Sequence, residues 1–396
     1  MNKPASCDIF CNVIDNYGDI GVCWRLARQL SNEHGLSVRL WVDDLSSLAR
    51  LCPEADGASE KQILREVEVC KWGKNFPDVK PADVVIEAFA CKLPQSYLEV
   101  MAAQAQQPVW INLEYLSAED WVESHHKLPS PHPKLPLTKY FFFPGFTRQT
   151  GGLLLERGLL AGRDAFRNDA MQQQAFWRSI GLDMPSAETL KISLFAYENA
   201  ALPGLLDAWS ASVQPVLCLV PEGRILPQVG RYFGDQMPHA GCDYVRGQLH
   251  VRVLPFVEQE RYDELLWACD VNFVRGEDSF VRAQWAARPF AWQIYPQDDA
   301  VHLKKLQAFL MLYDEQLSQS ARQAVAGLWQ LWNRSEAGAD STGFGQAWIS
   351  FVAARGELDQ HTQYWAWRLA ENNLALNLLD FCREIGRMRA LKIEGQ

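Results

Sequence analysis

Short apolar runs of strand length recur along the whole chain of 396 residues, and most are followed by a stretch with helical spacing. The first half contains "DIFCNVI", "LSVRLWVDD", "DVVIEAFA", "PVWINLEYL" and "KYFFFPGF". The second half contains "KISLFAY", "QPVLCLVPEG", "HVRVLPFV", "CDVNFVRGEDSF" and "PFAWQIYPQ". Alternation of strands and helices is typical of parallel sheets covered by helices. The sequence therefore predicts an α/β protein with two Rossmann-like domains.

A polar, helix-prone segment, "RDAFRNDAMQQQAFWRSIGLDMPSAETL", separates the two halves and lacks the strand pattern. We place the domain boundary near residue 183, which gives an N-terminal domain of residues 1–182 and a C-terminal domain of residues 183–362. Residues 363–396 predict a long amphipathic helix that joins the first domain. Two such domains facing each other leave a cleft at the carboxyl ends of their strands, where open α/β sheets bind ligands.

Composition and charge restrict the possible partners. Lys and Arg number 38 and Asp and Glu number 48, so the net charge is −10 with neutral histidines. An acidic surface disfavours nucleic acid and anionic membranes as partners. We expect no metal site, since the cysteines and histidines form no cluster with metal-ligand spacing. No signal peptide and no apolar run of bilayer length are recognisable, which favours a cytoplasmic protein.

Two acids flank a glycine in "VIDNYGDIGVCWRLARQL", between an expected strand and an expected helix. Asp19 fits the cap or first turn of that helix, where free N–H groups stabilise a carboxylate. Asp15 can form the turn, and Gly18 can take a positive φ. The alternative is catalytic, because a carboxylate beside the expected cleft can act as a general base. The glycine spacing differs from that of a dinucleotide-binding loop, which disfavours hydride transfer.

A second group of candidate residues lies at the end of the apolar run in "CDVNFVRGEDSF". Gly276 allows a tight turn, and Glu277, Asp278 and Ser279 lie where the next helix begins. Ser279 and the first N–H groups of this helix can bind a phosphate or diphosphate. Asp278 and Ser279 can equally be helix caps, whereas Glu277 has no evident capping role. This turn is therefore a candidate site for a phosphorylated ligand.

Four aromatic residues stand at the ends of expected strands. Phe195 and Tyr197 lie in "SLFAYENAAL", Phe256 in "VLPFVEQERYDELL" and Tyr295 in "WQIYPQDD". Each can belong to the hydrophobic core, which is the commoner role of such residues. If their loops face one cleft, the rings can instead form a pocket of the size of a nucleotide.

The stretches "DNYGDIGVCWRLARQL" and "RGEDSFVRAQWAARPFAWQIYPQDDAVHLKKL" closely resemble the EarP family of protein-arginine rhamnosyltransferases, which modify elongation factor P. Four further stretches, "NLEYLSAEDWVE", "FFFPGF", "GGLLLER" and "LPFVEQERYDELL", are also similar to that family. The resemblance thus runs through most of the chain and is weakest at about residues 314–360.

The resemblance implies a GT-B glycosyltransferase fold and a metal-independent, inverting protein-arginine N-rhamnosyltransferase. It places dTDP-β-L-rhamnose on the C-terminal domain and elongation factor P on the N-terminal domain, with no cofactor besides the donor substrate. By motif, Asp19 matches the general base, Asp15 a second required acid and Glu277 an essential glutamate. The positions assigned to donor binding are Gly18, Phe195, Tyr197, Phe256, Asp278, Ser279 and Tyr295.

The chemistry of arginine explains why two acids stand close together. A guanidinium has a pKa above about 12 and is a poor nucleophile, because its lone pairs are delocalised. A carboxylate can hold this cation by charge-assisted hydrogen bonds and accept a proton as the C–N bond forms. We expect Asp19 to be this base and Asp15 to orient the guanidinium or Asp19 itself.

Two other functions stay open. The same fold can serve a glycosyltransferase that acts on a small molecule, or a sugar-nucleotide epimerase. A different class is a non-catalytic protein that binds elongation factor P. Replacement of Asp19 by Asn separates the last class from an enzyme, since only an enzyme loses the modification while it still binds the acceptor.

Overall fold

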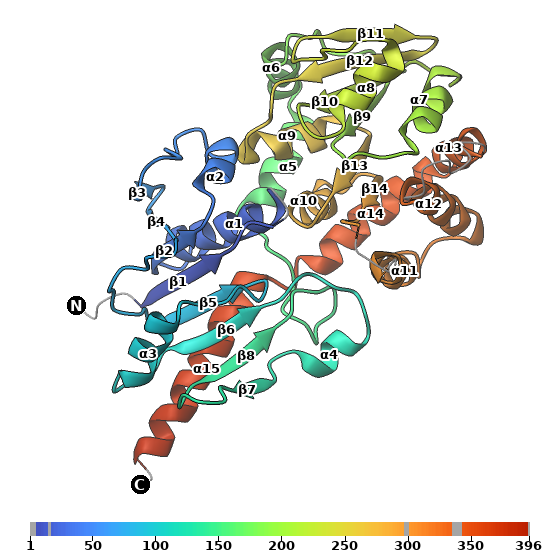
Figure 1. Ribbon diagram of the computed structural model, residues 1–396. Helices are drawn as coiled ribbons and strands as arrows, with labels where there is room; N and C mark the ends of the chain where they lie inside the picture. Colours follow the sequence, from blue (N-terminus) through green and yellow to red (C-terminus); the bar gives the residue numbers. More distant parts are fainter. Residues whose placement is uncertain (1–4, 15–16, 297–300, 335–342, 395–396) are drawn as a thin grey trace. The chain divides into compact units, whose positions relative to one another are not determined.

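The computed structural model is an α/β protein that divides into two compact units (Figure 1). Unit 1 comprises Met1–Arg157 and Leu369–Gln396, and unit 2 comprises Gly158–Arg368. Each unit contains a mostly parallel sheet, which confirms the predicted fold class. The structure describes residues 5–14, 17–296, 301–334 and 343–394.

Within the described residues, the sheet of unit 1 has eight strands in the order β3-β4-β2-β1-β5-β6-β8-β7. Neighbouring strands are parallel except at the two edges, where β3 and β7 run antiparallel to β4 and β8. The strand order reverses at β1, so the segments that follow β1 and β5 diverge. The strands are β1 (Ser6–Cys11), β2 (Ser37–Val42), β3 (Lys61–Leu64), β4 (Val67–Lys71), β5 (Val84–Ala88), β6 (Val109–Leu113), β7 (Pro129–Pro131) and β8 (Thr138–Phe142).

Alternate side chains of β1 face opposite layers of unit 1. Cys11 is buried and shares a hydrogen bond with Cys23 of α1. Phe10 points to the other face, where its ring centroid lies 4.9 Å from that of Tyr97 in α3. Successive side chains of β1 are thus buried on opposite faces, so the sheet is covered on both faces at this strand. The helices of unit 1 are α1 (Gly18–Asn32), α2 (Leu45–Leu51), α3 (Gln95–Ala103), α4 (Trp121–His125) and α15 (Leu374–Glu394).

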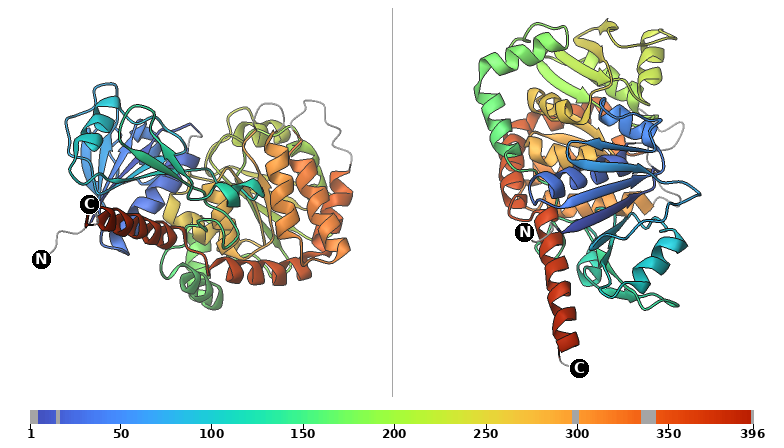
Figure 2. Two further views of the ribbon diagram at one scale, coloured as in Figure 1. Left: turned by 90° about the horizontal axis from the view of Figure 1, so that it is seen from below. Right: turned by 90° about the vertical axis from the view of Figure 1, so that its left-hand side faces the viewer.

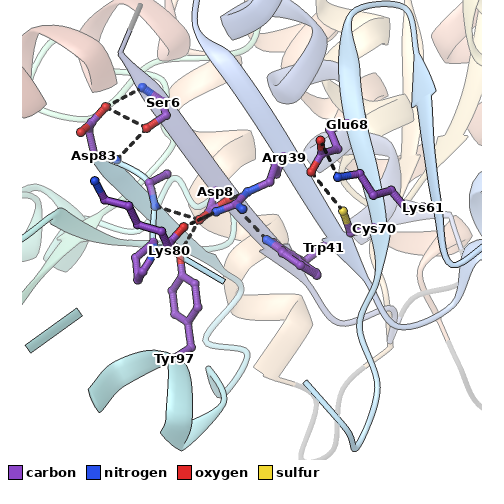
Figure 3. Close-up of polar contacts among 12 residues, drawn as sticks. Ser6, Asp8, Arg39, Trp41, Lys61, Glu68, Cys70, Lys80, Asp83 and Tyr97 are labelled. Carbon is purple, nitrogen blue, oxygen red and sulfur yellow. Dashed lines mark hydrogen bonds and ion pairs between the residues drawn. The ribbon is translucent and has the colours of Figure 1, made fainter. Parts of the chain in front are cut away.

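Asp8, on the same face of β1 as Phe10, is fully buried at the centre of a polar network (Figure 3). Arg39 donates to both carboxylate oxygens at 2.6 Å, and the N–H of Ala82 donates at 3.0 Å. The hydroxyl group of Tyr97 also donates to Asp8. A buried carboxylate is tolerated when its charge is paired and its oxygens are hydrogen-bonded. Asp8 therefore connects β1, β2 and α3.

We expect Asp8→Ala to lower the free energy of unfolding by about 3–5 kcal/mol, because it removes the buried acceptor shared by the half-buried Arg39, Tyr97 and the N–H of Ala82. Urea denaturation followed by circular dichroism measures this change. Asp78→Ala, at an exposed aspartate of the same unit, is the control and should change it by less than about 0.5 kcal/mol. Equal stabilities of the two variants would contradict the role given to Asp8.

The sheet of unit 2 has six strands among the described residues, in the order β11-β12-β10-β9-β13-β14. β11 runs antiparallel to β12, and the other neighbours are parallel. The order reverses at β9, so the segments after β9 and β13 diverge as those after β1 and β5 do. The strands are β9 (Leu190–Leu194), β10 (Val216–Pro221), β11 (Asp243–Arg246), β12 (Leu249–Leu254), β13 (Val271–Arg275) and β14 (Phe290–Gln293).

Aromatic side chains fill one face of the second sheet. Phe273 of β13 has its ring centroid 5.4 Å from Trp209 of α7, 5.3 Å from Trp332 of α12 and 6.4 Å from Trp348 of α13. Figure 2 shows α12 and α13 packed side by side. The helices of unit 2 are α5 (Leu159–Asn168), α6 (Ala170–Ser179), α7 (Leu202–Ser210), α8 (Leu226–Phe233), α9 (Gln259–Ala268), α10 (Asp278–Ala286), α11 (Val301–Tyr313), α12 (Gln319–Trp332), α13 (Phe344–Ala353) and α14 (Arg355–Leu369).

Unit 2 begins at Gly158, whereas the sequence predicts a domain boundary near residue 183. The intervening helices pack within unit 2. Phe166 of α5 lies against Trp267 of α9, with ring centroids 5.9 Å apart, and Arg167 donates to the carbonyl oxygen of Ala286 at the end of α10. Among the described residues, none of the helices combines the length and apolar character that a membrane crossing needs.

The last helix, α15, returns the chain to unit 1. Asn377 donates to the carbonyl oxygen of Gly151 at 3.0 Å, and Arg389 donates to that of Gln107 at 3.0 Å. α15 also packs beside α1 and β6. The helix thus covers one face of the sheet whose first strand begins at Ser6.

Candidate active site

Asp19 is the second residue of α1, and it is buried with 2% of its surface exposed. One carboxylate oxygen accepts a hydrogen bond from the N–H of Ile14 at 2.8 Å, which ties the segment after β1 to the start of the helix. Tyr17, rather than Asp19, is the N-cap residue. Gly18 is the first helical residue and so does not take the positive φ considered from the sequence. Asp15 lies outside the described residues.

The position of Asp19 in unit 1 suits a reactive carboxylate. β1 is the strand at which the order of the sheet reverses, and ligands of open α/β sheets bind at the carboxyl ends of strands at this point. The N-terminus of α1 stabilises a negative charge in its first turn. The burial and the bond to Ile14 hold the carboxylate in one orientation. Unit 1 therefore holds a fixed carboxyl group at the edge where a ligand is expected.

In unit 2, an arginine lies against two of the four predicted aromatic residues, and a third packs on one of these two. Arg275 is the last residue of β13, and its guanidinium carbon lies 4.5 Å from the ring centroid of Phe195 and 4.4 Å from that of Tyr197. Tyr295 packs edge-on against Tyr197, with centroids 5.5 Å apart. Phe256 is half-buried in the segment that follows β12. The carboxyl edge of this sheet thus combines a cation with aromatic rings.

Two further side chains fix the rings in place. Gln293 of β14 accepts a hydrogen bond from the N–H of Tyr197 at 2.8 Å, which ties the segment after β9 to β14. Tyr262 packs edge-on against Phe195, with centroids 5.7 Å apart. Burial raises the pKa of the Tyr262 phenol, so this group stays neutral at physiological pH. Contacts within unit 2 therefore hold this cluster in place.

Hydrogen bonds made by Ser279 and Trp292 stabilise the turn after β13. Gly276 has a φ of 60°, which favours glycine, and its carbonyl oxygen accepts a hydrogen bond from the indole of Trp292 at 2.7 Å. The hydroxyl group of Ser279 accepts from the N–H of Arg275 at 3.0 Å and donates to the carbonyl oxygen of the same residue. Ser279 thus fixes the end of β13 relative to α10. The role predicted for it in donor binding stays a prediction.

The two acids of the turn have different surroundings. Glu277 is the half-buried N-cap residue of α10 and forms no side-chain cap bond, as its sequence context indicates. Asp278 accepts a hydrogen bond from Gln259 of α9 at 3.3 Å. α10 is further held to α9 by two bonds of 2.7 Å between the buried Arg282 and Asp263. The N-terminus of α10, which can bind an anion, is thereby fixed beside Arg275.

Arg275 and Gln293 are absent from the residues predicted from the sequence. A cation at the end of an apolar strand, directly before a glycine turn, is visible in "NFVRGEDS" and could have been selected. Gln293 carries no such indication, because its importance comes from a contact with the distant Tyr197.

Other features of the structure lie apart from these residues. A cavity of about 860 Å³ in unit 1 is lined by residues such as Asp83, Val109 and Arg383. Asp83 and Val109 lie at the amino-terminal ends of β5 and β6, so the cavity is at the opposite edge of the sheet from Asp19. No three His, Cys, Asp or Glu side chains within the described part of the chain are grouped to hold a metal ion.

Two mostly parallel α/β units of this kind form the GT-B fold, and solved glycosyltransferases of that class are similar to this structure. The structure is similar to that of a glycosyltransferase from Rickettsia africae, with a TM-score of 0.54 and 8% identity, covering 96% of this chain and 98% of that one. At this identity the likeness concerns the fold alone.

The family described as "Elongation-Factor P (EF-P) rhamnosyltransferase EarP" matches residues 7–383. A protein-arginine rhamnosyltransferase of Pseudomonas putida is 52% identical over 381 residues, covering 96% of this chain and 99% of the relative. The solved structure "Structural basis for EarP-mediated arginine glycosylation of translation elongation factor EF-P" has a TM-score of 0.68 and 39% identity, covering 96% of this chain and 99% of that one. The chain belongs to the EarP family, which confirms the resemblance of its motifs.

Proposed function

We propose that this chain is a protein-arginine rhamnosyltransferase that transfers L-rhamnose from dTDP-β-L-rhamnose to an arginine side chain of elongation factor P. Membership of the EarP family supports this activity. The structural observation that carries it is the guanidinium of Arg275 between the rings of Phe195 and Tyr197, beside the start of α10.

This cluster has the chemistry that a nucleotide sugar requires. Arg275 and the N–H groups at the start of α10 can hold a diphosphate, because both offer positive charge and hydrogen-bond donors. The rings of Phe195, Tyr197 and Tyr295 can pack against the base and sugar of the nucleotide. When the bond to rhamnose breaks, the same groups stabilise the charge that develops on the leaving dTDP. Glu277 is proposed to position the donor or the acceptor.

Asp19 supplies the other half of the reaction. A nitrogen of the acceptor guanidinium attacks C1 of rhamnose, the bond between C1 and the diphosphate oxygen breaks, and Asp19 accepts a proton from the attacking nitrogen. Attack from the face opposite to dTDP inverts the anomeric configuration, so the β-linked donor gives an α-linked rhamnosyl arginine. Asp15 is proposed as a second acid that orients Asp19 or the guanidinium.

We expect purified elongation factor P to gain one deoxyhexose when it is incubated with this protein and dTDP-β-L-rhamnose. Asp19→Asn should slow the transfer by roughly 10²- to 10⁴-fold, because the amide cannot accept the proton. Intact-mass spectrometry measures the modification, and titration with dTDP shows whether the variant still binds the nucleotide. Asp78→Asn, at an exposed aspartate, is the control and should be as active as wild type.

Three results would contradict parts of this function. Transfer to a small molecule but not to elongation factor P would overturn the acceptor. Equal transfer from another deoxysugar nucleotide would overturn the donor preference. Full activity of Asp19→Asn would overturn the role of the base.

Arg275→Met should weaken dTDP binding by roughly 10- to 100-fold, because it removes a charged donor from the diphosphate. Isothermal titration calorimetry measures the dissociation constant. The matched control is Arg178→Met, at an exposed arginine of α6 in the same unit. If both variants bind dTDP as wild type does, the donor site is not at Arg275.

A further inference from the structure

The carboxyl ends of three neighbouring strands lie side by side in unit 1. β5 pairs with β1 on one side and with β6 on the other, in parallel register. The segment after β1 leads to Asp19, while those after β5 and β6 contain Phe89 and Tyr115. All three segments therefore leave the sheet at the edge where the acceptor is expected.

The backbone directly after β5 has an unusual conformation. Phe89 and Ala90 both have a φ of 55°, in the left-handed region that is unfavourable for residues with a Cβ atom. Two backbone hydrogen bonds hold it: the N–H of Phe89 donates to Leu113 at 2.7 Å, and that of Cys91 donates to Ala88 at 3.1 Å. Strained backbone of this kind is concentrated at sites that bind or react. The strain here fixes where the Phe89 side chain leaves the sheet.

The result is a stacked pair of rings. The centroids of Phe89 and Tyr115 lie 4.5 Å apart, and their planes differ by 19°. Phe89 is buried, with 7% of its surface exposed, whereas 37% of Tyr115 is exposed. Phe89 therefore supports one face of the Tyr115 ring from within, and part of the tyrosine side chain is exposed.

We propose, resting on the function proposed above, that the exposed part of the Tyr115 ring binds the guanidinium of the acceptor arginine by stacking. A planar, weakly hydrated guanidinium is attracted to the face of an aromatic ring. Stacking leaves the nitrogen atoms at the edge of the guanidinium accessible to a carboxylate and to the sugar. A guanidinium already lies over a tyrosine ring within this chain, since the guanidinium carbon of Arg275 is 4.4 Å from the ring centroid of Tyr197. Tyr115 is thus an acceptor-binding residue and Phe89 its positioning residue.

A double-mutant cycle on acceptor binding tests this contact without requiring turnover. The dissociation constant of unmodified elongation factor P is measured by isothermal titration calorimetry for wild type, Tyr115→Leu and Tyr115→Phe. The measurements are repeated with an acceptor whose modified arginine is replaced by methionine. Tyr364→Leu is the matched control, because Tyr364 of α14 is 41% exposed and lies in unit 2. Circular dichroism confirms that each variant is folded.

We expect Tyr115→Leu to weaken binding of the arginine-bearing acceptor by about 5- to 30-fold, and to have no effect on the methionine acceptor. Tyr115→Phe and Tyr364→Leu should stay within about twofold of wild type. A loss of the same size with both acceptors, or no loss with either, would overturn the proposal. Rhamnose transfer by wild type is assayed in parallel: its absence contradicts the proposed function, whereas the binding cycle decides the role of Tyr115 in either case.

Discussion

Two parallel strands of a sheet must be joined by a crossover segment that leaves the first strand at its carboxyl end. The segments after parallel strands therefore meet at one edge of the sheet, and the candidate residues of both units lie in these segments or at the ends of the strands. In unit 1 this arrangement brings Asp19 and Tyr115 to one edge of the sheet. In unit 2 it brings Arg275 and Tyr197 to the corresponding edge. At each edge the strand order reverses, and open α/β sheets bind ligands at such a point. The order in which the strands are connected thus determines which side chains come together in each unit.

The two units hold different charged groups at these edges. Unit 1 presents a buried carboxylate at a helix N-terminus, which suits the guanidinium of an acceptor. Unit 2 presents a buried guanidinium and the start of α10, which suit a diphosphate. The net charge of −10 does not reveal this division, because it sums both units and their surfaces. Local placement, rather than total charge, matches each unit to its proposed substrate.

The fold was largely predictable, because strands and helices have different spacings of apolar residues in the sequence. The turn at Gly276 was also recognisable, because the glycine stands at the end of an apolar strand. The surroundings of Arg275 were not, since they depend on rings contributed by segments far away in the chain. The local sequence pattern also predicted the start of unit 2 near residue 183 rather than at Gly158. The segment after Gly158 is polar on its outer side, and only the tertiary contacts of Phe166 and Arg167 show that it packs on α9 and α10. The backbone of Phe89 likewise gives no indication in the sequence.

The return of α15 to unit 1 also determines the order in which the two units can be completed during synthesis. Unit 2 is one continuous stretch, Gly158–Arg368, so all its residues emerge from the ribosome before α15 does. Unit 1 begins first in the sequence, yet the helix that covers one face of its sheet is made after the whole of unit 2. The domain encoded second can therefore be the first to fold, and the nascent unit 1 has to keep an apolar sheet face from aggregating until α15 has been made.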